Sequence, residues 1–194
     1  MDPVKTIKSK VVPVPLTDID TDLIIPAQYL TSISRGGYGE NLFRRLKDND
    51  PNFALNQAKY KGAEVLVADD NFGCGSSREH AVWAIREAGF KCVISKSFAD
   101  IFYNNSAKNG LLLVKLPADV VDEILAAAAK SDYEVTVDLA SQTVELPGGK
   151  KVSFDFDDFR KYCLLNGLDD IEYIRSNAEK VEAFRKQQKF LVTV

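Results

Sequence analysis

Short apolar runs alternate with amphipathic stretches through the middle of the chain. The predicted strands cover residues 63–68, 91–95 and 111–114, and helically spaced apolar residues mark residues 81–88 and 98–108. Such alternation of short apolar strands with helices predicts parallel strands joined by right-handed crossovers. The turn that follows the first strand then lies at the carboxyl end of the sheet, where open α/β sheets bind ligands.

The chain before this region has a less regular pattern. Residues 10–16 form an apolar run with two prolines, which lack the N–H of a strand ladder, so we predict an edge strand there. Three aspartates in residues 18–22 indicate a turn with side-chain-to-backbone hydrogen bonds. A calcium loop is less favoured, because the later glycine and glutamate of such a loop are missing. Residues 27–38 are predicted to be a surface loop, and residues 40–46 a short helix.

Towards the C-terminus the apolar pattern changes its period. The predicted elements are an amphipathic helix at residues 119–130, a strand at residues 133–137, a hairpin of residues 143–146 and 151–154, and a last helix at residues 178–189, capped by Asn177. Between the hairpin and the last helix, one further helix is predicted, which Asn166 and Gly167 end and which is lined by Phe156, Phe159, Tyr162 and Cys163. The whole pattern predicts a single domain, residues 1–194, of mixed α/β class with a helical C-terminal end.

Composition and charge narrow the class of protein. With 194 residues, 45% of them hydrophobic, the chain is long enough for one well-filled core. A net charge of -3 argues against general nucleic-acid binding, and no apolar run approaches the ~20 residues of a membrane span. The first residues have no apolar core like that of a signal peptide, and the three cysteines form no C-x-x-C pair. We therefore expect a soluble, cytoplasmic protein of a reducing compartment.

The candidate functional stretch is the glycine-rich turn after the first predicted strand of this alternating region. Gly73 and Gly75 lack a Cβ, so the backbone can turn sharply there and approach a ligand closely. The hydroxyls of Ser76 and Ser77 and the guanidinium of Arg78 follow at the start of a helix. Because a helix start offers free N–H groups and a positive dipole end, the combination predicts a site for an anion.

Three alternative interpretations of this turn stay open. Ser76 and Glu79 have the spacing of a capping box, which is a purely structural use of a serine. His80 lies one helical turn from Ser76, so a Ser–His pair is an option, although a structural histidine is favoured. A helix start lowers the pKa of a cysteine such as Cys74, but a cysteine nucleophile needs a base that the sequence does not offer.

Four motifs resemble one enzyme family. They are DTDLIIP at residues 20–26, NFGCGSSREHA at residues 71–81, SFADIF at residues 97–102, and residues 159–169. In this order they resemble the small subunit of bacterial 3-isopropylmalate dehydratase, the leucine-pathway isomerase of the aconitase superfamily. The resemblance implies the swivelling β/β/α domain of that superfamily, with a mixed sheet, as a separate polypeptide. Val82 departs from the proline of many relatives, which affects the start of the helix rather than the chemistry.

The activity that the resemblance implies is a reversible hydro-lyase reaction. 2-Isopropylmalate loses water to give isopropylmaleate, which is rehydrated to 3-isopropylmalate. Removal of a proton next to a carboxylate builds negative charge, so the site needs a base and fixed positive partners. By the family pattern, Ser76 is the catalytic base in its alkoxide form, and Ser77 and Arg78 contact the substrate.

Further substrate contacts are implied in the predicted surface loop. Arg35 matches an arginine that binds a substrate carboxylate, and the family's substrate-discriminating segment falls on residues 29–32, in which Tyr29, Leu30 and Thr31 are the candidate substrate contacts. A small residue such as Thr31 suits an isopropyl group better than a charged side chain does.

The resemblance also implies a large partner subunit that carries a 4Fe-4S cluster, whose iron acts as a Lewis acid for the leaving hydroxyl. This chain itself is expected to bind no metal. Cys92 lies in a predicted strand and Cys163 on an apolar helix face, where a free cysteine behaves as a small hydrophobe. Activity is therefore expected only with the large subunit.

Two alternatives to this function stay open at the level of the sequence. One is a subunit that acts on a related substrate, such as citraconate/methylmalate or homoaconitate. The other is a non-catalytic binding module on the same fold, against which the intact Arg35, Ser76, Ser77 and Arg78 count.

Overall fold

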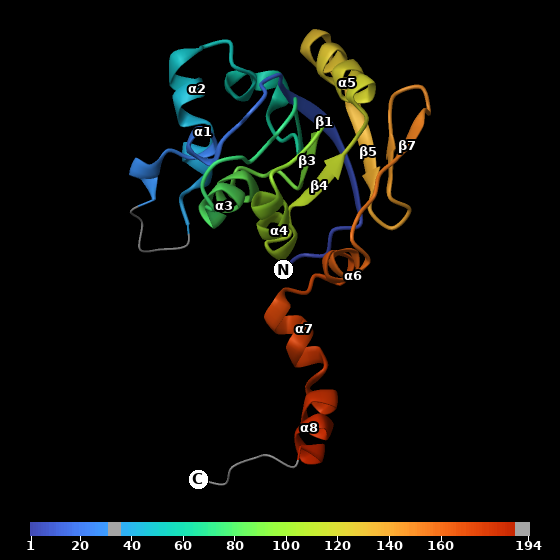
Figure 1. The fold of residues 1–194 in the computed structure, drawn as a ribbon. Coiled ribbons are helices and arrows are strands. Elements are labelled where there is room, and N and C mark those ends of the chain that lie inside the picture. The colour runs from blue at the N-terminus through green and yellow to red at the C-terminus, as the bar shows by residue number, and fades with distance from the viewer. Residues whose placement is uncertain (31–35, 189–194) are drawn as a thin grey trace.

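The computed structural model describes residues 1–30 and 36–188. Its strands are β1 (Thr6–Val14), β2 (Val65–Ala68), β3 (Cys92–Ser95), β4 (Leu112–Lys115), β5 (Glu134–Asp138), β6 (Thr143–Glu145) and β7 (Lys151–Ser153). Its α-helices are α1 (Thr21–Ile24), α2 (Arg44–Asn49), α3 (Glu79–Glu87), α4 (Asp100–Lys108), α5 (Ala118–Lys130), α6 (Asp158–Asn166), α7 (Asp170–Ser176) and α8 (Ala178–Gln187). Short 3-10 turns are η1 (Ala27–Tyr29), η2 (Gly39–Asn41), η3 (Ala54–Asn56) and η4 (Ala58–Tyr60). Figure 1 shows their arrangement.

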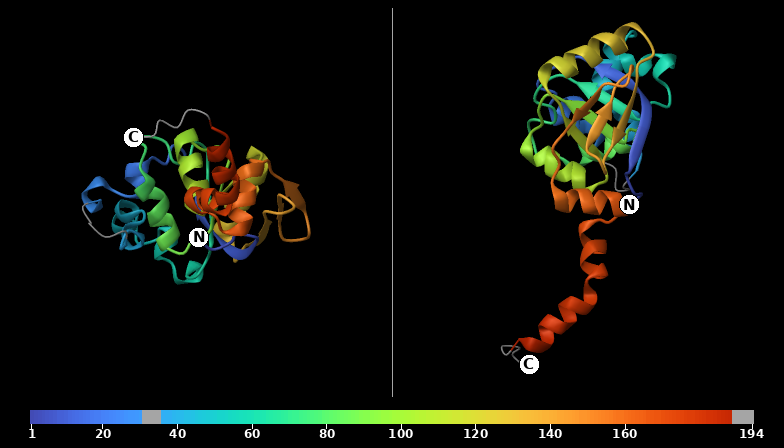
Figure 2. Two further views of the ribbon diagram at one scale, coloured as in Figure 1. Left: turned by 90° about the horizontal axis from the view of Figure 1, so that it is seen from below. Right: turned by 90° about the vertical axis from the view of Figure 1, so that its right-hand side faces the viewer.

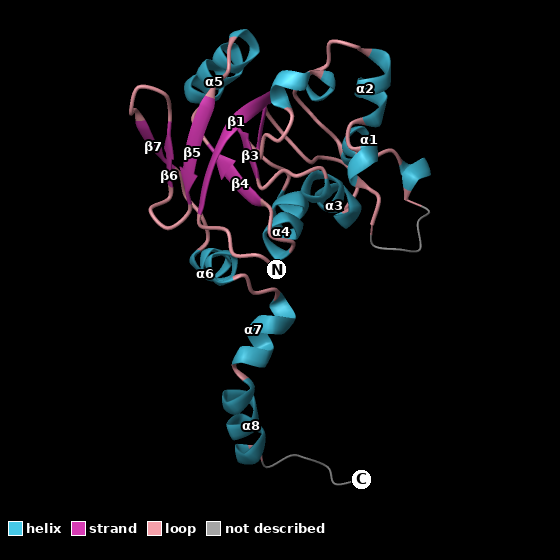
Figure 3. Cartoon of the chain, turned by 180° about the vertical axis from the view of Figure 1, so that it is seen from behind, coloured by secondary structure: helices cyan, strands magenta, loops and turns pink. Residues whose placement is uncertain are grey.

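Within the described residues the strands form one seven-stranded mixed sheet, in the order β4-β3-β2-β1-β5-β6-β7 (Figure 3). The half from β1 to β4 is parallel, as the alternation of strands and helices predicts. The half from β5 to β7 is antiparallel, and β6 and β7 are the predicted hairpin. The mixed α/β class is therefore confirmed.

The prediction that residues 10–16 form an edge strand is wrong. β1 lies inside the sheet and pairs with β5 through residues 6–10 and with β2 through residues 11–14. The strand changes its partner along its length, and Pro13 falls in the half that pairs with β2 and not with β5. A proline is tolerated there because its missing N–H faces the side without a β5 pairing.

The sheet separates two clusters of buried side chains. Alternation along β2 sends Val65 and Val67 to one cluster, and Leu66 and Ala68 to the other. Helix α5 contributes to the first cluster, whereas α1, α3 and α4 contribute to the second. Because β2 is buried on both faces, the point at which the glycine-rich turn leaves the sheet is rigidly placed.

Of two short elements predicted near the N-terminus, one is confirmed and the other is displaced along the chain. The predicted aspartate turn is confirmed, since the carboxylate of Asp20 accepts a hydrogen bond from the N–H of Leu23 at 2.7 Å and caps α1. The predicted helix at residues 40–46 is displaced, because η2 occupies residues 39–41 and α2 begins only at Arg44.

Helices α6, α7 and α8 make the helical C-terminal end. Asp157 caps the start of α6, since its carboxylate accepts a hydrogen bond from the N–H of Arg160, and Gly167, with a φ of 68°, caps its end. Figure 1 and the right-hand view of Figure 2 show α7 and α8 extending away from the sheet. No helix in residues 1–30 and 36–188 is long and apolar enough to cross a membrane.

The sequence predicts this end only in part. The last helix is confirmed as α8, but α7 is not predicted. The prediction that Phe156 lines the same helix as Phe159 and Tyr162 is wrong, because α6 begins only at Asp158. Cys163 is buried in α6 as an apolar residue, whereas Phe159 and Tyr162 are 40% and 51% exposed. Both rings instead contact Tyr173 of α7 edge-on. Asn177 joins α7 to α8, and its side chain donates to the carbonyl of Tyr173 rather than capping α8.

Candidate active site

The glycine-rich turn is held on one side by the segment that precedes α4. The N–H of Phe72 donates to the carbonyl of Ser97 at 3.1 Å, and the N–H of Ala99 donates to the carbonyl of Phe72 at 3.0 Å. These two bonds form a parallel bridge between Phe72 and Phe98. The start of the turn is thereby fixed to the start of α4.

On its other side the turn is held by the segment that leads into α1. The N–H of Gly73 donates to the carbonyl of Ile19 at 2.7 Å, and that of Thr21 donates to the carbonyl of Cys74 at 3.0 Å. The buried hydroxyl of Thr21 also donates to the carbonyl of Ser76 at 3.1 Å. The backbone that carries the candidate serine is therefore fixed on both sides before the side chains are considered.

The two glycines are needed for different reasons. Gly73 has a φ of 80°, and a Cβ there would lie 2.6 Å from the Cβ of Phe102, so both the conformation and the space exclude a side chain. Gly75 has a φ of 85°, but a Cβ there would lie 3.4 Å from the Cβ of Asp20, an ordinary contact. At Gly75 the conformation alone favours glycine.

The turn and the first turns of α4 enclose a cavity of about 230 Å³. Ser76, Ser77 and Arg78 line it from one side, and Asp100 and Asn105 of α4 from the other. Both serines are exposed. The predicted hydroxyls and guanidinium therefore converge on one cavity at the carboxyl end of β2, where the topology predicts a site.

Arg78 is fixed by an ion pair with Asp22 of α1. Its Nη1 donates to the carboxylate Oδ1 of Asp22, and the Arg78 side chain is only 21% exposed. The hydrogen bond from Arg78 lowers the pKa of Asp22 below its usual value of 3.8, so this carboxylate is charged at neutral pH. A guanidinium has five N–H donors. The pair with Asp22 uses Nη1 and orients the group, and the remaining N–H donors can bind an anion in the cavity.

The capping-box interpretation of Ser76 is wrong. Helix α3 begins at Glu79 with Arg78 in the N-cap position, and no side chain makes the cap hydrogen bond. The carboxylate of Glu79 accepts a hydrogen bond from Nδ2 of Asn109 at 2.7 Å instead of reaching back to the helix start. Ser76 lies two residues before the cap, so the end of the helix does not explain its hydroxyl.

Neither His80, in the first turn of α3, nor Cys74, in the glycine-rich turn, has the surroundings of a catalytic group. The ring of His80 packs edge-on against Trp83 and Tyr38, with centroids 4.8 and 5.4 Å apart, which supports the structural histidine. Burial raises the pKa of the Cys74 thiol, and the carboxylates of Asp20 and Asp18 raise it further. The expected lowering of this pKa is therefore wrong, and Cys74 is no thiolate nucleophile at neutral pH.

The remaining predicted residues lie towards the surface loop. Tyr29 and Leu30 are half-buried and pack against the cluster that α3 covers. Thr31 and Arg35 lie outside the described residues. The ion-pair partner Asp22 and the buried hydroxyl of Thr21 are part of the site's frame that sequence reasoning missed.

The described residues do not fit an iron–sulfur cluster. No group of three or more His, Cys, Asp or Glu side chains in that part of the chain could hold a metal ion. Cys92 and Cys163 are buried in β3 and α6, where burial raises the pKa of each thiol, and Cys74 lies apart in the turn.

Comparison with known families defines the class of protein first. The family model described as the Aconitase C-terminal domain matches residues 1–119, and the model described as LeuD_N matches residues 122–158. The chain therefore has the aconitase-type domain, and the fold class predicted from the resemblance is confirmed.

Individual relatives define the family more closely. The 3-isopropylmalate dehydratase small subunit of Francisella philomiragia is 49% identical over 185 residues, which cover 95% of this chain and 97% of that protein. That of Acidobacterium capsulatum is 52% identical over 188 residues, 96% of this chain and 91% of that protein. The crystal structure of a 3-isopropylmalate dehydratase from Methanocaldococcus jannaschii is 30% identical, with a TM-score of 0.70, and the match covers 93% of this chain and 99% of that one. This chain belongs to the 3-isopropylmalate dehydratase small-subunit family.

Proposed function

We propose that this chain is the small subunit of a hydro-lyase that isomerises 2-isopropylmalate to 3-isopropylmalate through isopropylmaleate, in leucine biosynthesis. The observation that carries the proposal is the cavity of about 230 Å³ on which Ser76, Ser77 and Arg78 converge. Family membership supplies the substrate class, and the site supplies groups suited to a dicarboxylate whose charge grows during the reaction.

Ser76 is the proposed base. Its alkoxide Oγ takes a proton from the carbon next to a substrate carboxylate while the C–O bond of the hydroxyl on the neighbouring carbon breaks, which gives isopropylmaleate. In the hydration step a hydroxyl adds to the carbon that lost the proton, and the Oγ–H of Ser76 gives its proton to the carbon that lost the hydroxyl. A serine hydroxyl is a weak base unless the charge on its oxygen is stabilised. Arg78, held by Asp22, and the free N–H groups at the start of α3 place positive charge at this point.

The same groups bind the substrate. Ser77 and Arg78 are proposed to contact the substrate beside the reacting carbons, and Arg35 to bind a carboxylate. Tyr29, Leu30 and Thr31 are proposed to select the alkyl group. Arg78 is suited to a carboxylate because its planar fork of donors matches the two oxygens.

The rest of the site is assigned to a large partner subunit, which is proposed to carry the 4Fe-4S cluster. This assignment is supported by the cysteines of this chain, which the described fold keeps apart. The cytoplasm is the proposed compartment, because buried free thiols suit a reducing environment.

Assembly with the cognate large subunit tests the proposal. Hydration of isopropylmaleate and of citraconate is measured as the loss of the absorbance of the substrate's C=C bond. The assay is run with this chain alone, with the large subunit alone and with the two together. We expect turnover only for the assembly, with isopropylmaleate preferred. Turnover by this chain alone, or a preference for citraconate, would contradict the proposal.

A further inference from the structure

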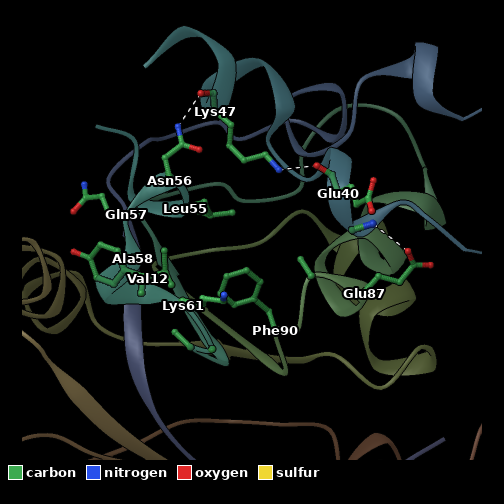
Figure 4. Close-up of a pocket in the computed structure, with 15 residues that line it drawn as sticks. Val12, Glu40, Lys47, Leu55, Asn56, Gln57, Ala58, Lys61, Glu87 and Phe90 are labelled. Atoms are coloured by element: carbon green, nitrogen blue, oxygen red, sulfur yellow. Dashed lines mark hydrogen bonds between the residues drawn. The ribbon is translucent and has the colours of Figure 1, made fainter. Parts of the chain in front are cut away.

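A cavity of about 510 Å³ beside the end of α3 is lined by three polar side chains that hold the backbone. Nζ of Lys47 donates to the carbonyl of Glu40 at 2.7 Å, and Nδ2 of Asn56 donates to the carbonyl of Lys47 at 2.8 Å (Figure 4). Oε2 of Glu87 accepts a hydrogen bond from the N–H of Gly39 at 3.0 Å. These three side chains therefore serve the fold, and their contacts do not point to a ligand.

The amide of Asn105, in the cavity of about 230 Å³ beside Ser76, has no such use. Asn105 lies in the second turn of α4 and is half-buried. Its backbone carbonyl accepts from Nδ2 of Asn109 at 2.8 Å, but within residues 1–30 and 36–188 its side-chain amide has no hydrogen-bond partner. Such an amide carries two N–H donors and an acceptor oxygen. Because it lines the cavity, these groups are open to a ligand there.

Asn104, the preceding residue of α4, shows how an asparagine is otherwise used in this helix. Its exposed side chain donates to the carbonyl of Asp100 at 3.0 Å, and Asn104 does not line the cavity. Asparagine is a weak helix former, because its side chain competes for the hydrogen bonds of the backbone. Among the described residues Asn104 makes such a backbone contact and Asn105 makes none, so the helix does not account for Asn105.

The two sides of the cavity differ in their chemistry. Ser76, Ser77 and Arg78 supply two hydroxyls and a guanidinium from the turn. The side at α4 is lined by Ala99, Asp100, Ile101, Phe102 and Asn105. The carboxylate of Asp100 has only acceptor oxygens and repels another carboxylate. Of the described residues on this side, Asn105 is therefore the one whose side chain can donate an N–H to an anion.

We infer that Asn105 is a substrate-binding residue: its Nδ2 donates to a substrate carboxylate from the side of the cavity opposite Ser76 and Arg78. This inference rests on the proposed function, which supplies a dicarboxylate as the ligand. A substrate held from both sides keeps the carbon that loses its proton beside Oγ of Ser76. The amide binds a carboxylate in the ground state and in the transition state alike, so its loss raises KM more than it lowers kcat.

The test uses the parental, Asn105→Ala, Asn105→Asp and Asn104→Asp chains, each assembled with the large subunit. Asn105→Ala should raise KM for 2-isopropylmalate about tenfold, as loss of a hydrogen bond to a charged group does, and change kcat by less than about threefold. Asn105→Asp keeps the shape but puts a negative charge against the carboxylate, so KM should rise about a hundredfold. Asn104→Asp adds the same charge at an exposed position outside the cavity, and as the matched control it should change KM by less than about threefold.

The order of these effects separates binding from support of the helix. Melting temperatures of the variant chains should stay near the parental value, because the Asn105 side chain holds no other described residue. A KM for Asn105→Asp no higher than that for Asn105→Ala would overturn the inference. So would an equal rise of KM in Asn104→Asp.

Thermal stabilisation of the assembly by 2-isopropylmalate gives a readout that does not need turnover. The rise in melting temperature should be smaller for Asn105→Asp than for the parental assembly, because weaker binding stabilises less. Equal rises in the two assemblies would contradict the role of Asn105. If the parental assembly were stabilised but failed to convert 2-isopropylmalate, the proposed function would fall, and a smaller rise in Asn105→Asp would still support the contact.

Discussion

Arg78, the residue before α3, donates a hydrogen bond to the carboxylate of Asp22, which lies 56 residues earlier in the chain. The pair ties the start of α3 to α1 across the glycine-rich turn. It also fixes the one guanidinium among the described residues that line the cavity beside Ser76. The substrate-binding role proposed for Arg78 therefore depends on a residue outside the turn.

Replacing Asp22 tests this dependence. Asp22→Asn keeps an oxygen acceptor but removes the negative charge that attracts the guanidinium. Arg78 should then be held less firmly in its orientation, and kcat/KM of the assembled enzyme should fall about tenfold to a hundredfold. Because the pair is partly exposed, the free energy of unfolding should change by about 1 kcal/mol or less. Asp48→Asn, which removes the carboxylate of an exposed ion pair with Arg44, is the matched control. Parental kcat/KM in Asp22→Asn would show that Arg78 needs no such partner.

The same pair predicts a pH dependence of stability. Arg78 lowers the pKa of Asp22 in the folded chain below its usual value of 3.8. A lowered folded-state pKa contributes stability above the unfolded-state value, and that stability is lost as the pH falls through the folded-state value. In urea unfolding, the difference between the parental chain and Asp22→Asn should be constant from about pH 7 to pH 5 and should shrink below about pH 4. A difference that grows towards acid pH would contradict the assignment.

Two glycines with the same backbone angle separate space from conformation. Gly73 and Gly62 both have a φ of 80°, but a Cβ at Gly73 would meet Phe102, whereas nothing lies within 4 Å of one at Gly62. Gly62→Ala should cost about 1 kcal/mol through the backbone alone. Gly73→Ala should cost about 1–3 kcal/mol more, as for overpacking in a core. Thermal unfolding measures both, and equal losses would mean that Phe102 moves aside without cost.

The sequence predicts the parallel half of the fold well because its elements are locally encoded. β2, β3 and β4 are short apolar runs, and α3 and α5 show helical spacing, so each can be recognised without knowing its neighbours. The edge position of β1 was wrong because the prolines indicate only that a ladder N–H is missing. They do not show that β1 changes its partner between residues 10 and 11.

The sequence predicts the residues of the candidate site that are consecutive in the chain, but it does not predict their contacts with residues far away in the sequence. Ser76, Ser77 and Arg78 are consecutive, so their convergence follows from the turn. The contact of Arg78 with Asp22 joins two residues 56 positions apart, which no local pattern reveals. The capping-box spacing of Ser76 and Glu79 was misleading, because the helix begins two residues later than that motif requires.

The cysteines predict that the purified chain binds no cluster. Cys74 lies in the turn, Cys92 in β3 and Cys163 in α6, with the last two buried. Anaerobic reconstitution with iron and sulfide should therefore leave less than a stoichiometric amount of iron on this chain and no visible cluster absorption. The large subunit, treated in the same way, is the positive control. A stoichiometric cluster on this chain alone would overturn the proposed division between the subunits.

The central claim is that Ser76 is the base, and its replacement tests this most directly. Since Arg78 occupies the N-cap of α3, Ser76→Ala removes the hydroxyl without removing a helix cap, so the melting temperature and the affinity for the large subunit should stay near parental values. Ser77→Ala, at the neighbouring hydroxyl, should mainly raise KM. The decisive quantity is kcat of the assembled Ser76→Ala enzyme with 2-isopropylmalate. Loss of a general base predicts a fall of about a hundredfold to ten-thousandfold, whereas retention of more than about a tenth of parental kcat would contradict the account.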